Sequence, residues 1–127
     1  MDILFLLGRI VVGGYFIYNA INHFTNTEML TGYAASRRLP SPRLGTIVGG
    51  IFILLGGLGV LLGAYTTLAI ALLIIFLVAT AFGIHHFWTD ADPMQKMGEK
   101  TNFFKNLALA GALLMTLLVE GWPFSIF

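Results

Sequence analysis

The sequence contains no cysteine and little charge, and both absences narrow what the protein can be. Without cysteine the chain can form no disulfide, thiol relay, thiolate-bound metal or iron–sulfur cluster. Charged residues make up 10% of the 127 residues and hydrophobic residues 57%, which is too apolar for an ordinary soluble domain. The formal net charge of +1 gives no reason to expect nucleic-acid binding. The composition favours a single integral-membrane domain over residues 1–127.

Long apolar runs are what the sequence does contain. No Asp, Glu, Lys or Arg lies between Arg43 and Asp90, and a helix needs about 20 apolar residues to cross a bilayer core. Two spans fit in this interval, joined by a turn at Ala64–Tyr65, and a further apolar run lies on each side of them. The sequence thus predicts an all-α fold, an integral-membrane antiparallel four-helix bundle. Its predicted spans are residues 3–22, 44–63, 66–85 and 103–120.

Two features modify this bundle. Within the polar link of residues 23–43 we expect a short interfacial helix at Thr27–Ser36, with its apolar face on the membrane surface. The second span is glycine-rich, with Gly45 and Gly49 four residues apart, so that neighbouring helices can approach closely. This favours tight packing inside the protein, and a homo-oligomer through the glycine faces is the alternative. The third span, almost wholly Leu, Ile, Ala and Phe, is expected to face lipid more.

The basic residues predict the orientation of the chain. Six of the seven Lys and Arg residues lie in or beside the two polar links, residues 23–43 and 89–102, and the seventh is Arg9. The positive-inside rule therefore places the links in the cytoplasm and both termini outside. We expect a protein of the plasma (inner) membrane, in contact with the lipid bilayer.

Antiparallel packing would bring a set of polar residues together at the cytoplasmic end of the bundle. Polar groups at the membrane edge can hold the head of a ligand while the spans hold its tail. The same residue types also serve as ordinary interfacial anchors, and the sequence leaves both interpretations open. At this level, beside Arg43 and His85, the candidate binding residues are Asn19, Asn22, His23, His86, Trp88, Lys105 and Asn106.

Arg9 lies inside the first predicted span, roughly 10 Å along the helix from Asp2 at 1.5 Å per residue. A charge at that depth is unfavourable unless it faces protein and has a partner. Glu120 lies at the same end of the fourth span, so we predict a structural ion pair between Arg9 and Glu120. A ligand or proton site at this position is the alternative. The first apolar run also lacks the small-residue site at which a signal peptide would be cleaved, which indicates that this run is a membrane span that the protein retains.

The three histidines give little support for a metal site. His85 and His86 are adjacent, so on a helix their side chains diverge by about 100° instead of sharing one face. His23 would have to complete any site, and no two histidines face each other at mid-membrane depth as a haem would require. No Ser/His/Asp group, phosphate-binding glycine loop or carboxylate pair indicates soluble-enzyme chemistry, so no catalytic residue is predicted.

Several short motifs occur in order along nearly the whole chain. They are Arg9 with Gly13, the run from Met29 to Pro40 before the glycine-rich span, His86-Phe87-Trp88, and Lys105-Asn106-Leu-Ala-Leu-Ala-Gly111. Together they resemble the DoxX family of small four-span membrane proteins. The resemblance implies a four-helix membrane bundle and a loose association with electron transfer, since the family takes its name from a subunit of a thiosulfate:quinone oxidoreductase. A wider superfamily includes membrane chaperones. Many relatives carry an acidic residue in span two, where Ile51–Leu55 is apolar here.

Two functions of different classes fit these features. The first is a quinone- or lipophile-binding subunit of a membrane oxidoreductase, acting with a protein partner that carries the redox centre. Its walls and hydrogen-bonding groups would be Phe16, Phe82, Trp88, Asn19, His86 and Asn106, with Arg9 or Lys105 stabilising negative charge. The second is a non-catalytic scaffold or assembly protein. Transport is weaker, because the chain has no convincing internal repeat. A binding subunit needs a pocket open to lipid, whereas a scaffold should have its spans packed shut.

Overall fold

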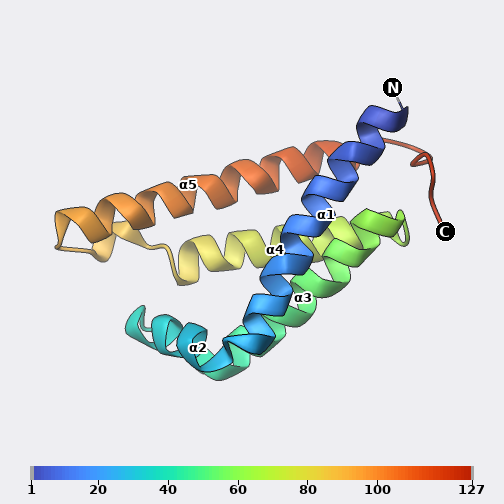
Figure 1. Ribbon diagram of the computed structural model, residues 1–127. Helices are drawn as coiled ribbons and strands as arrows, with labels where there is room; N and C mark the ends of the chain where they lie inside the picture. The colour runs from blue at the N-terminus through green and yellow to red at the C-terminus, as the bar shows by residue number, and fades with distance from the viewer. Residues whose placement is uncertain (1, 127) are drawn as a thin grey trace.

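The computed structural model describes residues 2–126 and contains, within that range, five α-helices and one short 3-10 helix. In chain order they are α1 (Asp2–Thr25), α2 (Thr27–Ser36), α3 (Pro42–Leu62), α4 (Thr66–Gly83), the 3-10 helix η1 (Phe87–Thr89) and α5 (Pro93–Thr116). The all-α fold class is confirmed, and the predicted short helix has the predicted bounds. α2 lies beside the end of α1 and the start of α3, away from both termini (Figure 1).

Three segments of the described chain are long and apolar enough to cross a membrane. They are Asp2–Thr25, Pro42–Leu62 and Thr66–Thr89, which correspond to α1, α3 and α4 with the residues that follow it. Each exceeds the length of about 20 residues that a bilayer core requires. The chain is therefore an integral membrane protein with at least these three candidate spans.

α5 differs from the fourth span that the sequence predicted. It begins at Pro93, so most of the predicted polar link is in fact helical, and it ends at Thr116. The early start has a local cause: the Asp92 side chain accepts a hydrogen bond from the backbone nitrogen of Gln95 (2.9 Å), and proline occupies the first turn. An Asp cap followed by proline is a strong helix start, because both satisfy or remove unpaired N–H groups.

The long helices pack as a row in the order α1, α3, α4, α5. α3 packs against α1 on one side and α4 on the other, and α4 packs in turn against α5. Within residues 2–126, the backbone of α1 makes no close approach to α4 or α5. The largest fully buried side chains, Phe16, Ile53, Ile70 and Leu73, come from the three helices in the first part of this row. α4 is slightly less buried than α3, in the predicted direction, and α1 is the least buried of the three.

Glycine permits the close contact between α1 and α3. A Cβ added at Gly13 would lie 2.9 Å from the carbonyl oxygen of Gly57, and one added at Gly57 would lie 3.1 Å from the carbonyl oxygen of Gly13. On the other side of α3, a Cβ at Gly59 would lie 2.5 Å from the Cβ of Ala69 in α4. The glycine faces are thus used for packing inside the chain, which is the use that the sequence favoured.

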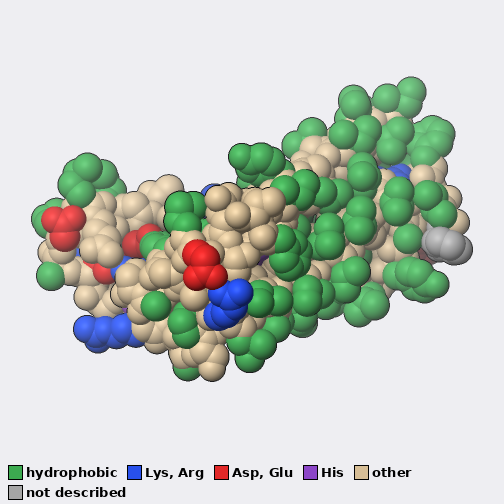
Figure 2. All heavy atoms as spheres, turned by 60° about the horizontal axis from the view of Figure 1, so that its bottom comes forward, with side chains coloured by type: hydrophobic (Ala, Val, Ile, Leu, Met, Phe, Trp, Pro, Cys, Tyr) green, Lys and Arg blue, Asp and Glu red, His purple; other side chains and the backbone are tan. Residues whose placement is uncertain are grey.

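Charge and apolar surface are separated along the molecule. In the face that Figure 2 shows, charged side chains gather over the end that carries α2 and the start of α5, and hydrophobic side chains cover most of the end that carries the termini. Large apolar side chains of α1 that are well exposed include Leu4, Val11 and Tyr18. A surface of this kind suits lipid, and the charged end suits the membrane edge.

Candidate functional site

A cavity of about 580 Å³ lies at the end of the molecule that carries the polar links, and residues of all five α-helices line it. This volume is typical of small-molecule sites, which span roughly 300–1,000 Å³. The walls are mainly apolar and include Phe16, Phe52 and Phe76. Several lining residues are exposed, among them Tyr15 of α1, Val48 of α3, Ile75 of α4 and Lys105 of α5, so the cavity is open to the outside.

Five of the seven predicted binding residues line this cavity. They are Asn19, Asn22 and His23 from α1, and Lys105 and Asn106 from α5. Five further polar residues join them: Tyr15, Tyr33, Thr46, Thr80 and His85. The structure therefore brings together polar residues that are up to 91 positions apart in the sequence, from Tyr15 to Asn106.

The other two predicted residues, His86 and Trp88, are not among the cavity-lining residues. Both ring nitrogens of His86 are occupied elsewhere, Nε2 with the carbonyl oxygen of Arg37 (2.7 Å) and Nδ1 with the hydroxyl of Thr89 (2.7 Å). The exposed Trp88 ring packs instead against the ring of Phe103, with centroids 5.5 Å apart. His86 therefore helps to hold α2 near the end of α4, and of the two adjacent histidines it is His85 that lines the cavity.

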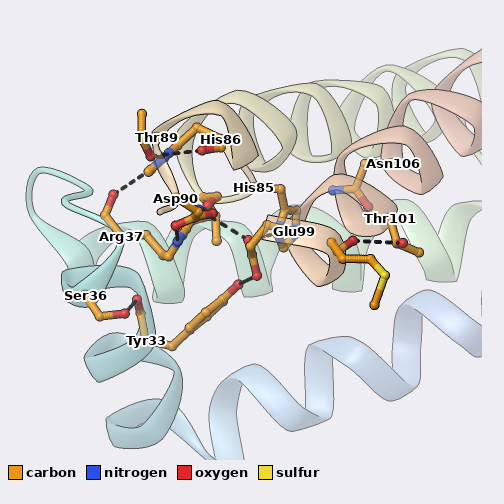
Figure 3. A network of polar contacts seen from close by, with 12 residues as sticks. Tyr33, Ser36, Arg37, His85, His86, Thr89, Asp90, Glu99, Thr101 and Asn106 are labelled. Atoms are coloured by element: carbon orange, nitrogen blue, oxygen red, sulfur yellow. Dashed lines mark hydrogen bonds and ion pairs between the residues drawn. The ribbon is translucent and has the colours of Figure 1, made fainter. Parts of the chain in front are cut away.

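Figure 3 shows a network of charged and polar side chains, most of them buried, and two of its members, Tyr33 and His85, also line the cavity. Arg37 forms a two-pronged ion pair with Asp90, with nitrogen–oxygen distances of 2.6 and 2.9 Å. Glu99 holds His85 Nδ1 at 2.8 Å, accepts a hydrogen bond from the Tyr33 hydroxyl, and lies 3.6 Å from Arg37 Nη2. Arg37, His85 and Glu99 are all at most 9% exposed. Paired charges at this depth hold one another in fixed positions.

The contacts in this network alter the proton affinity of its members. The hydrogen bond from Arg37 holds the pKa of Asp90 below its ordinary value, and the same bond raises the pKa of Arg37. Burial raises the pKa of the Tyr33 hydroxyl above 10, and its hydrogen bond to Glu99 adds to the rise. At neutral pH the network therefore holds an ionised Asp90, a cationic Arg37 and a protonated Tyr33.

The sequence did not predict this network. From the sequence, Tyr33 is expected in the short helix, Arg37 in the first polar link, and Asp90 and Glu99 in the second polar link. One feature of the sequence predicts that Glu99 is buried. The buried face of α5 contains, at helical spacing, Glu99, Phe103, Asn106, Ala110 and Leu113. Extending the stripe of Asn106 backwards by two turns leads to Glu99, which makes a buried carboxylate the expectation once the helix is known to start at Pro93.

Hydrogen bonds fix how three of the cavity residues present their polar atoms. His23 Nδ1 lies 2.8 Å from the carbonyl oxygen of Thr46, so Nδ1 carries the proton of that ring. The amide nitrogens of Asn19 and Asn106 donate to the carbonyl oxygens of Tyr15 (2.8 Å) and Leu77 (3.3 Å). Each of the three side chains therefore keeps an acceptor atom, His23 Nε2 or an amide oxygen, that is not used in these bonds.

Arg9 is buried, as predicted, but its partners are backbone carbonyls. Nε donates to Val60 (3.1 Å), Nη2 donates to Leu61 (3.0 Å) and Phe124 (3.2 Å), and Nη1 donates to Pro123. The predicted ion pair with Glu120 is therefore wrong within the described residues: Glu120 is exposed and lies beyond the end of α5. The guanidinium instead satisfies carbonyls in the last turn of α3, where the helix end is negative.

The arrangement at Arg9 also holds the segment after α5. The Arg9 guanidinium carbon lies 5.7 Å from the centre of the Trp122 ring, and the backbone nitrogen of Ile126 donates to the carbonyl oxygen of Leu62. Arg9 thus joins three parts of the chain and has a structural role. No group of three or more His, Asp or Glu residues that could hold a metal ion occurs among residues 2–126.

Comparison with known proteins gives two matches. The sequence profile of the DoxX family matches residues 4–86. The chain is also 29% identical, over 113 residues, to inner membrane protein YphA of Escherichia coli strain K12, an alignment that covers 89% of this chain and 80% of that protein. No solved structure matches this chain.

Proposed function

The chain belongs to the DoxX family, and from this premise we propose that it is a membrane subunit that binds a quinone or another lipophile in the cavity. The single observation that carries the proposal is the cavity itself: about 580 Å³, with mainly apolar walls and a smaller set of polar groups. A protein whose only task was to dock others would need no such space between its spans. The volume and lining are those of a site for an amphiphile.

The proposed ligand would lie with its ring among the aromatic walls and its polar head near Asn106 and His85. Its tail would leave the cavity past Tyr15, which is exposed beside the apolar surface of α1. Lys105 at the rim would stabilise negative charge on the head. In this role the protein binds and positions the ligand, and a partner protein that carries a redox centre exchanges electrons with it.

We propose further that α5 completes an antiparallel four-span arrangement with α1, α3 and α4. α5 packs along α4, and its sequence is apolar from Phe103 onwards apart from Lys105, Asn106 and Thr116. The links that carry α2 and the start of α5 would lie in the cytoplasm, because six of the seven basic residues are in or beside them. Both termini would lie outside, and the relative from E. coli suggests the inner membrane.

The proposal is tested by identifying what the protein carries out of the membrane. The protein would be purified in a mild detergent, and small molecules extracted from it would be identified and counted by mass spectrometry. An Ala79→Trp variant fills the cavity, since Ala79 lines it. Ala108→Trp is the matched control, because Ala108 is exposed on α5 and is not a lining residue.

We expect close to one lipophile per chain in the wild type and the A108W control, and a large loss in A79W with folding retained. A folded wild-type protein that carries no such molecule, and takes up no added quinone, would overturn the proposal. The scaffold function would then be the better interpretation, and the next step would be to identify the protein that it holds.

A further inference from the structure

One ring nitrogen of His85 is directed to the cavity. His85 lines the cavity, and its Nδ1 is held by Glu99 at 2.8 Å. Nε2 makes no hydrogen bond within the described chain. In that part of the chain, every side-chain nitrogen or oxygen that is fully shielded from solvent has a hydrogen-bond partner. Nε2 must therefore reach accessible space. Since the residue is only 9% exposed, the accessible space next to it is the cavity.

Glu99 determines how that nitrogen behaves. A carboxylate can only accept, so Nδ1 of His85 must carry a proton, and in the neutral ring Nε2 is then an acceptor. Glu99 belongs to α5, and it accepts a hydrogen bond from the hydroxyl of Tyr33 in α2 and lies 3.6 Å from Nη2 of Arg37 at the end of α2. Residues of two helices therefore fix the position of its carboxylate. A carboxylate that orients a histidine and stabilises its charged form is the arrangement of a proton acceptor.

The charges around His85 suit a group that gains and loses a proton. Arg37, Asp90 and Glu99 together carry one net negative charge, which a proton on His85 would balance. Burial beside apolar walls acts in the opposite direction, because it disfavours a charged ring. Across the cavity the other titratable lining groups are Tyr15 and His23 on α1, Tyr33 on α2 and Lys105 on α5, of which only Lys105 carries a fixed positive charge.

We propose that the Glu99–His85 pair is the proton acceptor of the cavity, and that the ligand class is a lipophile with an acidic hydroxyl on an aromatic ring, a phenol or hydroquinone. This inference rests on the proposed function, because it needs a ligand in the cavity. In the step, the hydroxyl O–H bond breaks and an N–H bond forms at His85 Nε2. The electron pair stays on the ligand oxygen, so the product is a phenolate beside an imidazolium that Glu99 stabilises. No electron is transferred.

The step has a chemical use in a membrane oxidoreductase. A phenolate gives up electrons far more readily than a phenol does, so a site that removes the proton prepares the ligand for a redox partner. The oxidised quinone, which has no hydroxyl to donate, would lack this contact with Nε2. The Glu99–His85 pair would therefore distinguish the reduced ligand from the oxidised one.

A chromophoric phenol tests the proposal directly. The probe is a 4-nitrophenol with a long alkyl chain, whose absorbance changes when it loses its proton, and the control compound is its methyl ether. Binding to purified wild-type protein would be measured for both compounds, and the ionised fraction of the bound phenol would be recorded across neutral pH. Variants are His85→Gln, Glu99→Gln and Lys105→Gln, with His86→Gln as the matched control because His86 does not line the cavity.

At neutral pH we expect the ratio of ionised to protonated probe to be at least about tenfold higher on the protein than in protein-free micelles, which corresponds to lowering the pKa of the bound phenol by one unit. H85Q and E99Q should remove most of this effect while still binding the methyl ether, whereas H86Q should keep it. If the ether and the phenol both bind but the phenol is no more ionised than in micelles, the proton-acceptor inference is wrong and the cavity function stands. If K105Q removes the effect and H85Q does not, the ammonium group is responsible and the inference is again wrong. If neither compound binds, both proposals fail.

Discussion

Replacing Arg9 should destabilise the protein more than any other single change at the end of the molecule that carries the termini. Its guanidinium makes four hydrogen bonds to carbonyl oxygens, two in the last turn of α3 and two in the segment after α5. Arg9→Met would leave these carbonyls without their donor while keeping most of the side-chain volume. At about 1 kcal/mol net for each bond, the expected loss of unfolding free energy is about 4 kcal/mol.

Two further variants separate the possible causes. Arg9→Lys keeps the positive charge but loses the planar fork, so it can satisfy about half of the carbonyls and should lose about 2 kcal/mol. Glu120→Gln should change stability by less than about 0.5 kcal/mol, because Glu120 is exposed and has no ion pair in the described chain. This order distinguishes carbonyl capping from an ion pair, in which R9M and E120Q would have similar effects.

The assay is reversible unfolding in mixed micelles with increasing denaturing detergent, followed by tryptophan fluorescence. Trp122 packs beside Arg9 and reports on this end of the molecule, and a Trp88→Phe background removes the only other tryptophan. The reasoning would be refuted if R9M unfolded at the same detergent fraction as the parent, or if E120Q were as destabilised as R9M.

Two further predictions concern packing and pH. Gly13→Ala should lose about 1–3 kcal/mol of stability, because its Cβ would meet backbone atoms of α3. Gly14→Ala has open space around it and should be neutral or slightly stabilised. Thermal unfolding of the two variants side by side measures the difference in stability between them. The Arg37–Asp90 pair should stabilise the fold above about pH 4 and lose its contribution as the pH falls through the lowered pKa of Asp90. Asp90→Asn should therefore be less stable than the wild type at pH 7, with a gap that narrows towards pH 3; a gap that stays constant with pH would contradict the pairing.

The parts of the fold that depend on local sequence could be predicted. Apolar runs set the positions of α1, α3 and α4, and turn residues around a short amphipathic segment set the bounds of α2. The glycine faces were also interpretable, because close helix packing needs small residues wherever it occurs. The start of α5 also depends on local sequence, because Asp92 followed by Pro93 is a helix-start signal.

The errors at the site came from contacts that sequence spacing cannot give. The two adjacent histidines could not be told apart, because α4 ends at Gly83 and both lie in non-helical backbone where the 100° rule does not apply. Glu99 is buried only because Arg37, His85 and Tyr33 reach it from other elements. Arg9 was correctly predicted to be buried, but its carbonyl partners depend on a non-helical segment that folds back after α5.

The measurement that tests the central claim most directly is photolabelling of the protein in native membranes with an azido-quinone, followed by peptide mapping. The account predicts labels on the cavity-lining stretches, residues 15–23 of α1 and 75–85 of α4 with its following turn, and predicts that excess unlabelled quinone and the Ala79→Trp variant both remove them. Labels confined to the exposed apolar surface of α1, unaffected by competitor and by A79W, would mean that the probe only partitions into lipid, and would contradict the account.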